Sequence, residues 1–305
     1  MKKKDVYISI ELKVREFLSQ ILLSYFLSRK GYRVYLGSKN QIIDMVINKK
    51  NKSGIFFYKA GVNKKLIDQI DKNTDAHIVL DQEIGPGLLE NQYNLEVPNA
   101  FHKKTLKKID YYFALNKKIY DVSKKKLMGI RGKAFLTGWP RVDLWKPKYK
   151  FFYEEKIIEK KKKYKNFILF NSDFATISKY YKEEITQYTP WGFEHNENKK
   201  KRYKDDRVNF AKNSYLEFLE FVKFIKQFAN NNKKQCIVIR PHPAENLNIW
   251  IENFRNIRNI HIESPKDDVT SWIYSASFVI HRGCTTALQS IFMKKPTAFV
   301  QLDKK

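Results

Sequence analysis

The sequence predicts an α/β fold built from two parallel sheets, and three observations support this prediction. Short runs rich in β-branched and aromatic residues alternate with segments of helical periodicity along the chain. Glycines such as Gly31 and Gly37 fall between these segments, where the chain must turn. Apolar residues make up 43% of the 305 residues, so the chain can bury the cores of two ordinary domains.

The first half of the chain reads as a strand, a helix and a strand, followed by further elements of the same kind. Residues 14–29 are the first expected helix, and Gly31 follows it as a C-cap signal. We expect this helix to pack on the core through Val14, Leu18, Ile21, Leu22, Tyr25 and Phe26. The expected strands are 6–10, 33–36, 54–58, 77–81, 111–114 and 134–137, and the other helices are 64–72 and 104–109. Strand–helix–strand units of this kind build parallel sheets.

A change of composition over residues 146–165 indicates a boundary between two domains, 1–145 and 146–305. This stretch is rich in Lys, Glu, Tyr and Phe, which predicts a linker followed by a solvated helix. A second α/β series follows, with a polar and partly irregular insertion over 172–207. Its strands are expected at 166–171, 235–240, 260–263, 278–281 and 297–300, and its helices at 209–230, 246–254, 269–276 and 285–293. The two series predict two Rossmann-like domains facing across a cleft, with ligands at the carboxyl ends of the strands.

The net charge of +27 does not by itself indicate a nucleic-acid partner. The excess is mostly lysine and is spread along the chain, whereas nucleic-acid-binding proteins tend to gather positive charge on one face or tail. We therefore expect no specific nucleic acid as a partner, although a nucleic-acid-binding protein stays open as an alternative. The lysine runs at 160–163 and 199–201 are typical of solvated faces; alternatively, they would favour peripheral association with an anionic membrane surface.

Cysteine usage and the lack of a targeting segment predict a cytoplasmic protein. Cys236 and Cys284 belong to no CxxC or Cys/His cluster, so neither a structural zinc nor a disulfide is expected. No apolar run reaches the ~20 residues that cross a bilayer, and the N-terminus does not read as a signal peptide. The expected location is the cytoplasm, including the inner face of the membrane.

The turn Arg240-Pro241-His242-Pro243 lies at the carboxyl end of an expected strand. Two prolines fix the backbone around His242. Arg240 can hold a phosphate through two hydrogen bonds, and His242 can donate a proton to a phosphate oxygen or a leaving group. The alternative is a tight turn with a capping histidine, but ligand sites favour this end of a sheet.

The turn over residues 281–286 also follows a strand, and it opens a helix. Gly283 permits a close turn. The N–H groups at the helix start, together with Arg282 and the hydroxyls of Thr285 and Thr286, would form an anion site. A simple threonine N-cap is the alternative. Because both turns lie at one edge of the same sheet, we expect them to hold the phosphate of a nucleotide between them.

Two further segments are candidates for the other wall of the cleft. The 81–85 loop ends a strand of the first half, and a carboxylate there could take a proton from an acceptor hydroxyl. Glu83 is the first candidate for this base and Asp81 the second, with a solvated acidic loop as the alternative. Glu11 and Arg15 lie where the first strand passes into the first helix and are candidates to contact the acceptor; a surface helix start explains them equally well.

The sequence predicts neither a metal nor a cofactor. It contains no P-loop and no dinucleotide-binding glycine motif, which excludes the standard forms of those enzymes. Asp268, beside Asp267, is best explained as a helix N-cap. Asp205 and Asp206 lie in a lysine-rich stretch that would neutralise them.

Residues 10–16, 31–34 and 137–143 resemble segments of bacterial surface carbohydrate biosynthesis proteins. The 81–85 loop is similar to their Asp-x-Glu-Gly motif, with Ile84 inserted before the glycine. The 240–243 turn and the strand–Thr-Thr–helix segment are similar to sites of the wider GT-B group, which includes capsule Kdo transferases and CDP-glycerol glycerophosphotransferases. The order of these motifs spans nearly the whole chain.

The resemblance implies a GT-B architecture in which the second domain binds the donor and the first binds the acceptor, without a metal. His242 and the Thr285-Thr286 turn would hold the donor phosphate, and Glu83 or Asp81 would be the base. The donor would be a CMP-, CDP- or UDP-linked sugar, and the acceptor a glycan or a lipid-linked molecule. GT-B proteins usually continue with helices that return to the first domain, so the end at Lys305, just after a strand, implies a shortened second domain.

We therefore expect a glycosyltransferase or phosphosugar transferase of surface polysaccharide biosynthesis, of the capsule or O-antigen kind. A sugar-nucleotide 2-epimerase on the same fold is the alternative among enzymes. A nucleic-acid-binding protein and a non-catalytic surface-assembly protein are the alternatives from other classes.

Overall fold

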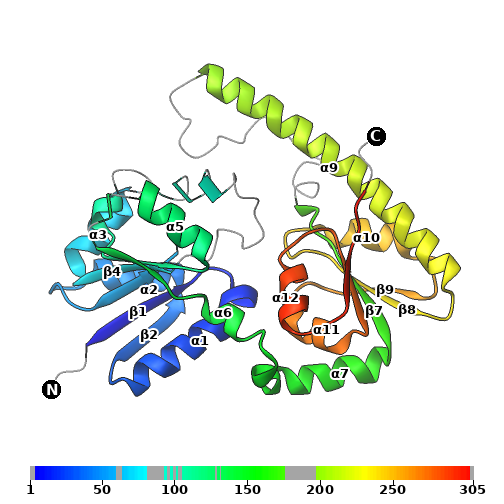
Figure 1. Ribbon diagram of the computed structural model, residues 1–305, viewed down its shortest axis with the longest axis horizontal. Helices are drawn as coiled ribbons and strands as arrows, with labels where there is room; N and C mark the ends of the chain where they lie inside the picture. Colours follow the sequence, from blue (N-terminus) through cyan, green and yellow to red (C-terminus); the bar gives the residue numbers. More distant parts are fainter. Residues whose placement is uncertain are drawn as a thin grey trace. The chain divides into compact units, whose positions relative to one another are not determined.

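The chain folds into two compact units, Met1–Tyr149 and Lys150–Lys305, each built on a parallel sheet with helices packed against it (Figure 1). The computed structural model describes residues 4–59, 64–80, 93–94, 97–98, 101, 105–127, 129–130, 132–175 and 197–302. The predicted α/β class with two Rossmann-like units is confirmed. The two units divide between Tyr149 and Lys150.

Parallel strands form the first sheet in the order β2-β1-β3-β4-β5-β6. They are β1 (Asp5–Ile10), β2 (Arg33–Ser38), β3 (Ile55–Tyr58), β4 (Ala76–Leu80), β5 (Tyr111–Ala114) and β6 (Lys133–Leu136). From β1 the chain passes to β2 at the edge of the sheet and then crosses back to β3 on the other side of β1. The strand order therefore reverses between β1 and β3, which is where ligands of open α/β sheets bind.

Helices cover both faces of the first sheet. They are α1 (Lys13–Arg29), α2 (Lys39–Ile47), α3 (Lys64–Asn73), α5 (Lys117–Lys126) and α6 (Pro140–Asp143), with a 3-10 turn at Leu106–Lys108. One face packs against α1 and carries Trp139, and the opposite face packs against α2, α3 and α5. The helix predicted over 104–109 is wrong, because this segment makes a 3-10 turn within its described part. The helices α2, α5 and α6 were not predicted from the sequence.

The buried face of α1 differs from the predicted one. Its exposed apolar side chains are Phe17, Ile21, Tyr25 and Phe26. The helix instead packs on the sheet through Leu23 and Leu27. Its first turns bury Glu16, Ser19 and Gln20. Polar residues are buried there because this end of α1 borders the carboxyl ends of the strands rather than the apolar core.

The second sheet is also parallel and has the order β11-β10-β7-β8-β9. Its strands are β7 (Phe167–Asn171), β8 (Cys236–Arg240), β9 (Ile260–Ile262), β10 (Phe278–His281) and β11 (Thr297–Phe299). The chain runs from β7 outward to β8 and β9, and then crosses back to β10 on the other side of β7. The strand order of this sheet therefore reverses between β7 and β10.

The helices of the second unit are α7 (Glu154–Tyr164), α9 (Glu197–Asn231), α10 (Leu247–Phe254), α11 (Val269–Ser275) and α12 (Thr286–Phe292), preceded by a 3-10 segment at Pro147–Tyr153. Phe170 on the sheet packs against Phe221 of α9, and Trp250 of α10 joins the same cluster. On the other face, α7 lies beside α11 (Figure 1), with Tyr164 and Phe167 around Trp272.

Two predictions about the second unit are corrected. The expected solvated helix after the linker is α7, but it buries Ile157, Lys160 and Tyr164 because it packs against α11. The polar insertion is helical from Glu197 onward, since α9 begins twelve residues before the predicted start at residue 209. Within the described ranges, no helix has the length and apolar character needed to cross a bilayer.

Candidate functional site

The carboxyl edge of the second sheet brings the two predicted turns together. Asn171, at the end of β7, pairs in register with Arg240 of β8 on one side and with His281 of β10 on the other. Neighbouring strands lie about 4.8 Å apart, so the three backbones fall within about 10 Å. The 240–243 turn and the 281–286 turn therefore start from the same edge, separated by β7.

The 240–243 turn is held by Glu245, a residue that the sequence analysis missed. The buried Glu245 carboxylate accepts hydrogen bonds from Ser172 Oγ at 2.8 and 2.9 Å, Phe174 N at 2.7 Å, Trp250 Nε1 at 2.8 Å and His242 N at 3.2 Å. Burial raises its pKa to about 7, against the lowering effect of these hydrogen bonds. One carboxylate thus joins the end of β7, the turn and α10.

His242 is half-buried and has a defined ring orientation. Its Nδ1 accepts a hydrogen bond from Ala244 N at 3.2 Å, and its own backbone N–H donates to Glu245. An accepting Nδ1 places the proton of the neutral ring on Nε2. The turn therefore presents Nε2–H as a hydrogen-bond donor.

Arg240 lies below the turn rather than at its tip. Its Nη2 donates to the backbone carbonyl of Pro265 at 3.1 Å and to that of Asp267. Burial lowers its pKa to about 10, and the nearby carboxylates of Asp268 and Asp267 partly oppose that effect. The guanidinium braces the loop before α11, and its predicted contact with a phosphate stays a prediction. Asp268 caps α11 as predicted, because its side chain accepts from Thr270 N at 2.7 Å.

The 281–286 turn depends on Gly283, whose φ of +92° is accessible to few other residues. A Cβ at this position would come within 3.3 Å of the Phe299 ring. Gly283 N donates to His281 Nδ1 at 3.0 Å, so the turn folds back on the end of its own strand.

The other predicted phosphate-binding residues of this turn are Arg282, Thr285 and Thr286, and each has different neighbours. Arg282 pairs with Asp173 at 2.9 Å and with Glu217, and its guanidinium lies 4.6 Å from the centre of the Phe174 ring. Thr286 Oγ1 contacts Cys284 Sγ at 2.7 Å. Thr285 occupies the N-cap position of α12 without a side-chain capping bond, so the simple threonine N-cap does not describe it. Its side chain is exposed.

Asn171 lies between the two turns and was not predicted from the sequence as a site residue. The residue is 2% exposed, and neither its Oδ1 nor its Nδ2 has a hydrogen-bond partner in the described part of the chain. Leaving a buried amide unsatisfied costs free energy. An amide in this position is typical of a group that a ligand or an ordered water completes.

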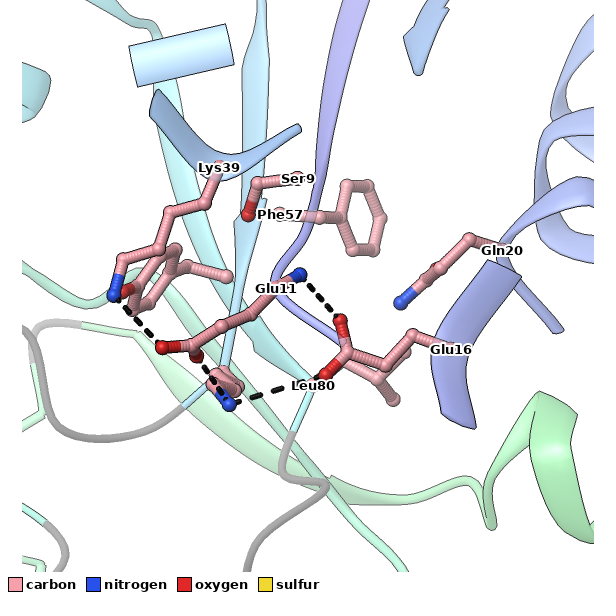
Figure 2. Close-up of a pocket in the computed structure, with 9 residues that line it drawn as sticks. Ser9, Glu11, Glu16, Gln20, Lys39, Phe57 and Leu80 are labelled. Carbon is pink, nitrogen blue, oxygen red and sulfur yellow. Dashed lines mark hydrogen bonds and ion pairs between the residues drawn. The ribbon is translucent and has the colours of Figure 1, made fainter. Parts of the chain in front are cut away.

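The first unit has a pocket at the carboxyl ends of β1, β3 and β4, next to the reversal of its strand order (Figure 2). Its lining residues are Ser9, Glu11, Glu16, Gln20, Lys39, Phe57, Tyr58, Lys59 and Leu80. Glu11 connects the two lysines, since its Oε1 lies 3.2 Å from Lys39 Nζ and its Oε2 pairs with Lys59. Glu16 accepts from Glu11 N at 2.7 Å and lies 3.9 Å from Lys59 Nζ.

The pocket includes one of the two predicted acceptor-binding residues. Glu11 is in its wall, whereas Arg15, half-buried on α1, is not among its lining residues. Burial alone would raise the pKa of Glu11, but the hydrogen bonds and charges of Lys59 and Lys39 lower it below its usual value. The predicted bases, Asp81 and Glu83, lie outside the described residues. Leu80, the residue before Asp81, is part of the pocket wall.

Comparison with solved structures identifies the fold as GT-B-like. The wall teichoic acid polymerase TagF, in a variant soaked with CDPG, is similar with a TM-score of 0.55 and 10% identity, over 98% of this chain and 70% of that chain. The UDP-GlcNAc 2-epimerase from Methanocaldococcus jannaschii has a TM-score of 0.54 and 11% identity, over 97% of this chain and 83% of that chain. No family model and no curated protein matches the sequence.

Proposed function

We propose that this protein is a glycosyltransferase or phosphosugar transferase of bacterial surface polysaccharide biosynthesis. The second unit binds a CMP-, CDP- or UDP-linked donor through the two turns at its sheet edge, and the first unit binds a glycan or lipid-linked acceptor. The reaction needs no metal in this proposal, because protein groups stabilise the phosphate.

One observation carries the proposal: His242, Asn171 and the 281–286 turn meet at the carboxyl edge of one sheet, at and beside the reversal of its strand order. This place is where open α/β sheets bind nucleotides. The similarity to GT-B-like structures over nearly the whole chain is consistent with this use of the edge.

The chemistry follows from the groups in the two turns. During transfer the bond between the sugar and the phosphate breaks, and negative charge develops on the leaving phosphate oxygen. His242 Nε2–H would donate to that oxygen, and the exposed Thr285 hydroxyl would donate to a second one. Glu83, or Asp81 in its place, would take the proton of the attacking acceptor hydroxyl.

The donor site can be tested by titrating CMP, CDP and UDP into the full chain by calorimetry. We expect at least one nucleotide to bind the wild type and to bind His242→Ala at least tenfold more weakly, since a hydrogen bond to a charged group is lost. His261→Ala is the matched control, because His261 is an exposed residue of β9. Equal binding by wild type and His242→Ala, or no binding by either, would contradict the donor site.

Turnover separates the transferase from its rival on the same fold. A transferase releases the nucleotide only when an acceptor is present. Conversion of a UDP-sugar into its 2-epimer without any acceptor would show instead that the protein is an epimerase.

The same proposal places the protein at the inner face of the membrane, and α1 is the element that supports this. Phe17, Ile21 and Tyr25 recur every four residues on its exposed side, so they form one apolar stripe. Lys13 and Arg29 lie against the rings of Phe17 and Tyr25, at 5.6 and 5.9 Å from their centres. An apolar stripe with basic neighbours is typical of helices that lie in an anionic membrane surface.

Sedimentation with lipid vesicles tests this contact. We expect the protein to sediment with phosphatidylglycerol vesicles but not with phosphatidylcholine vesicles. Replacing Phe17 and Ile21 together by serine should reduce the bound fraction, whereas replacing the exposed apolar Leu216 and Leu219 of α9 should not. Equal losses in the two double variants would argue against α1 as the contact.

A further inference from the structure

We propose that the pocket of the first unit binds an uncharged polyhydroxyl group, either a sugar ring or a polyol, as the acceptor. The role of this ligand as the acceptor rests on the proposed function. Its binding to the pocket can be measured whether or not that function is correct. Four properties of the pocket support the inference: its place in the sheet, the balance of its described charges, its unpartnered polar groups and its apolar wall.

The pocket lies where the topology leaves room for a ligand. Ser9 and Glu11 lie at and just after the end of β1, and Phe57 and Lys59 at and just after the end of β3. These are the two strands between which the order of the sheet reverses. The helices that follow β1 and β2 supply the remaining polar residues, Glu16 and Gln20 from α1 and Lys39 from α2 (Figure 2).

Among the described residues, the charges around the pocket balance each other. Two carboxylates, those of Glu11 and Glu16, face the two ammonium groups of Lys39 and Lys59. A phosphate at the lysines would meet the Glu11 carboxylate that lies between them, and it would lie close to Glu16. A cation would meet the two ammonium groups instead. The balance therefore favours an uncharged ligand, which can donate to the carboxylates and accept from the lysines.

Two polar side chains of the pocket each have an oxygen without a hydrogen-bond partner among the described residues. Gln20 is 6% exposed, and its buried Oε1 has no hydrogen-bond partner in the chain as described. Its side chain points toward the Glu16 carboxylate and the pocket in Figure 2. Ser9 Oγ likewise makes no hydrogen bond within the described ranges. An amide and a hydroxyl placed beside carboxylates provide the mixture of donors and acceptors that sugar hydroxyls require.

The apolar part of the wall and the open side suit the packing of one sugar ring. The space is about 350 Å³, and this figure includes the open solvent at its mouth. Phe57 and Leu80 add apolar surface against which the C–H groups of a ring can pack. A larger glycan would extend out of the pocket, with its terminal residue inside.

Saturation-transfer NMR on the full chain tests the inference with defined probes. The uncharged probes are glycerol and the methyl glycosides of glucose, galactose and N-acetylglucosamine; the charged probes are glycerol 3-phosphate and glucose 6-phosphate. We expect at least one uncharged probe to bind in the millimolar range and more tightly than either phosphate. Its affinity should fall about tenfold in Gln20→Leu, because one hydrogen bond to the ligand is lost.

Controls separate a lost contact from a damaged fold. Gln69→Leu, an exposed glutamine of α3, should leave binding unchanged. Ser9→Ala is a second pocket variant that removes one hydroxyl and little volume, and it should weaken binding by a smaller factor. No binding by any uncharged probe, unchanged binding in both pocket variants, or tighter binding of the phosphates would overturn the inference.

The results of the probe experiment can be distinguished from those of the nucleotide titration that tests the proposed function. The nucleotide titration depends on His242 in the second unit, and the probe experiment depends on Gln20 and Ser9 in the first. Nucleotide binding without probe binding would leave the donor site in place and refute the pocket. Probe binding without nucleotide binding would support the pocket and refute the transferase.

Discussion

Both sheets of this protein reverse their strand order, but the polar groups at the two reversals are held in different ways. In the first unit, partly exposed charges pair across a pocket, with Glu11 between Lys39 and Lys59. In the second unit, the buried Glu245 gathers four donors from three segments. The first arrangement can open to admit a ligand at little cost, whereas the second fixes the position of His242.

This difference favours a separate role for the carboxyl edge of each sheet, with the donor at the second sheet and the acceptor at the first. A diphosphate develops charge during transfer and benefits from donors that are already in place, such as a rigid His242. An acceptor hydroxyl gains more from groups that exchange partners readily. The following predictions test this contrast, from the largest expected effect to the smallest.

Glu245→Ala should cause the largest loss of stability. It leaves the donors of Ser172, Phe174 and Trp250 buried without an acceptor, and each such loss costs about 1–3 kcal/mol. We expect the free energy of unfolding, measured with urea, to fall by at least about 3 kcal/mol. Glu252→Ala, at an exposed site of α10, should change it by less than about 0.5 kcal/mol. Similar small losses in both variants would show that Glu245 does not hold the turn.

The pH dependence of stability should report the same carboxyl group. Burial raises the pKa of Glu245 from 4.5 to about 7 in the folded protein, so the folded state binds more protons between these values. The protonated Glu245 therefore stabilises the folded state fully below pH 4.5, and this stabilisation is lost as the pH rises through 7. The free energy of unfolding should fall by an amount on the order of 3 kcal/mol.

Glu245→Gln cannot titrate at this position, so its unfolding free energy should fall less steeply over the same range of pH. Urea melts of wild type and variant at several pH values measure the two slopes. Parallel curves would mean that the pKa of Glu245 is not raised.

Asn171→Leu should raise stability and weaken nucleotide binding. Leucine has nearly the shape of asparagine but leaves no buried amide unsatisfied, so we expect a gain of about 1 kcal/mol in the free energy of unfolding. Affinity for the nucleotide should fall about tenfold if the amide contacts it. Thermal melts and calorimetry measure the two effects, and a loss of stability together with unchanged affinity would assign Asn171 to the core alone.

Glu11→Gln should have the smallest effect on stability. Its side chain is 38% exposed, and partly exposed ion pairs contribute about 0–1 kcal/mol. The free energy of unfolding should therefore change by less than about 1 kcal/mol. A loss as large as that of Glu245→Ala would show that the two edges are held in the same way.

The sequence predicted the strands better than the helices. Strands such as β7 and β8 are short apolar runs with clear ends, and buried parallel strands need nothing more. The face of α1 was predicted from its apolar residues, but Ile21, Tyr25 and Phe26 among them are exposed, and the first turns bury the polar Glu16 and Gln20 beside the pocket. Periodicity identifies a helix, and the neighbours that it meets in three dimensions decide which face is buried.

In the candidate site, too, local sequence patterns did not show contacts between residues that are distant in the sequence. The two turns of the second unit could be predicted because each follows a strand directly in the sequence. Glu245 could not be assigned its role, because its partner Ser172 is 73 residues away. Asn171 and Gln20 were missed for a related reason: their importance lies in the absence of partners, which no local pattern records.

The most direct test of the account is a crystal structure of the protein with CDP bound. We predict that the phosphates lie at the edge of the second sheet, within hydrogen-bonding distance of His242 Nε2 and close to Thr285 and Asn171. Phosphates bound instead in the pocket of the first unit, between Lys39 and Lys59, would contradict the assignment of the two edges.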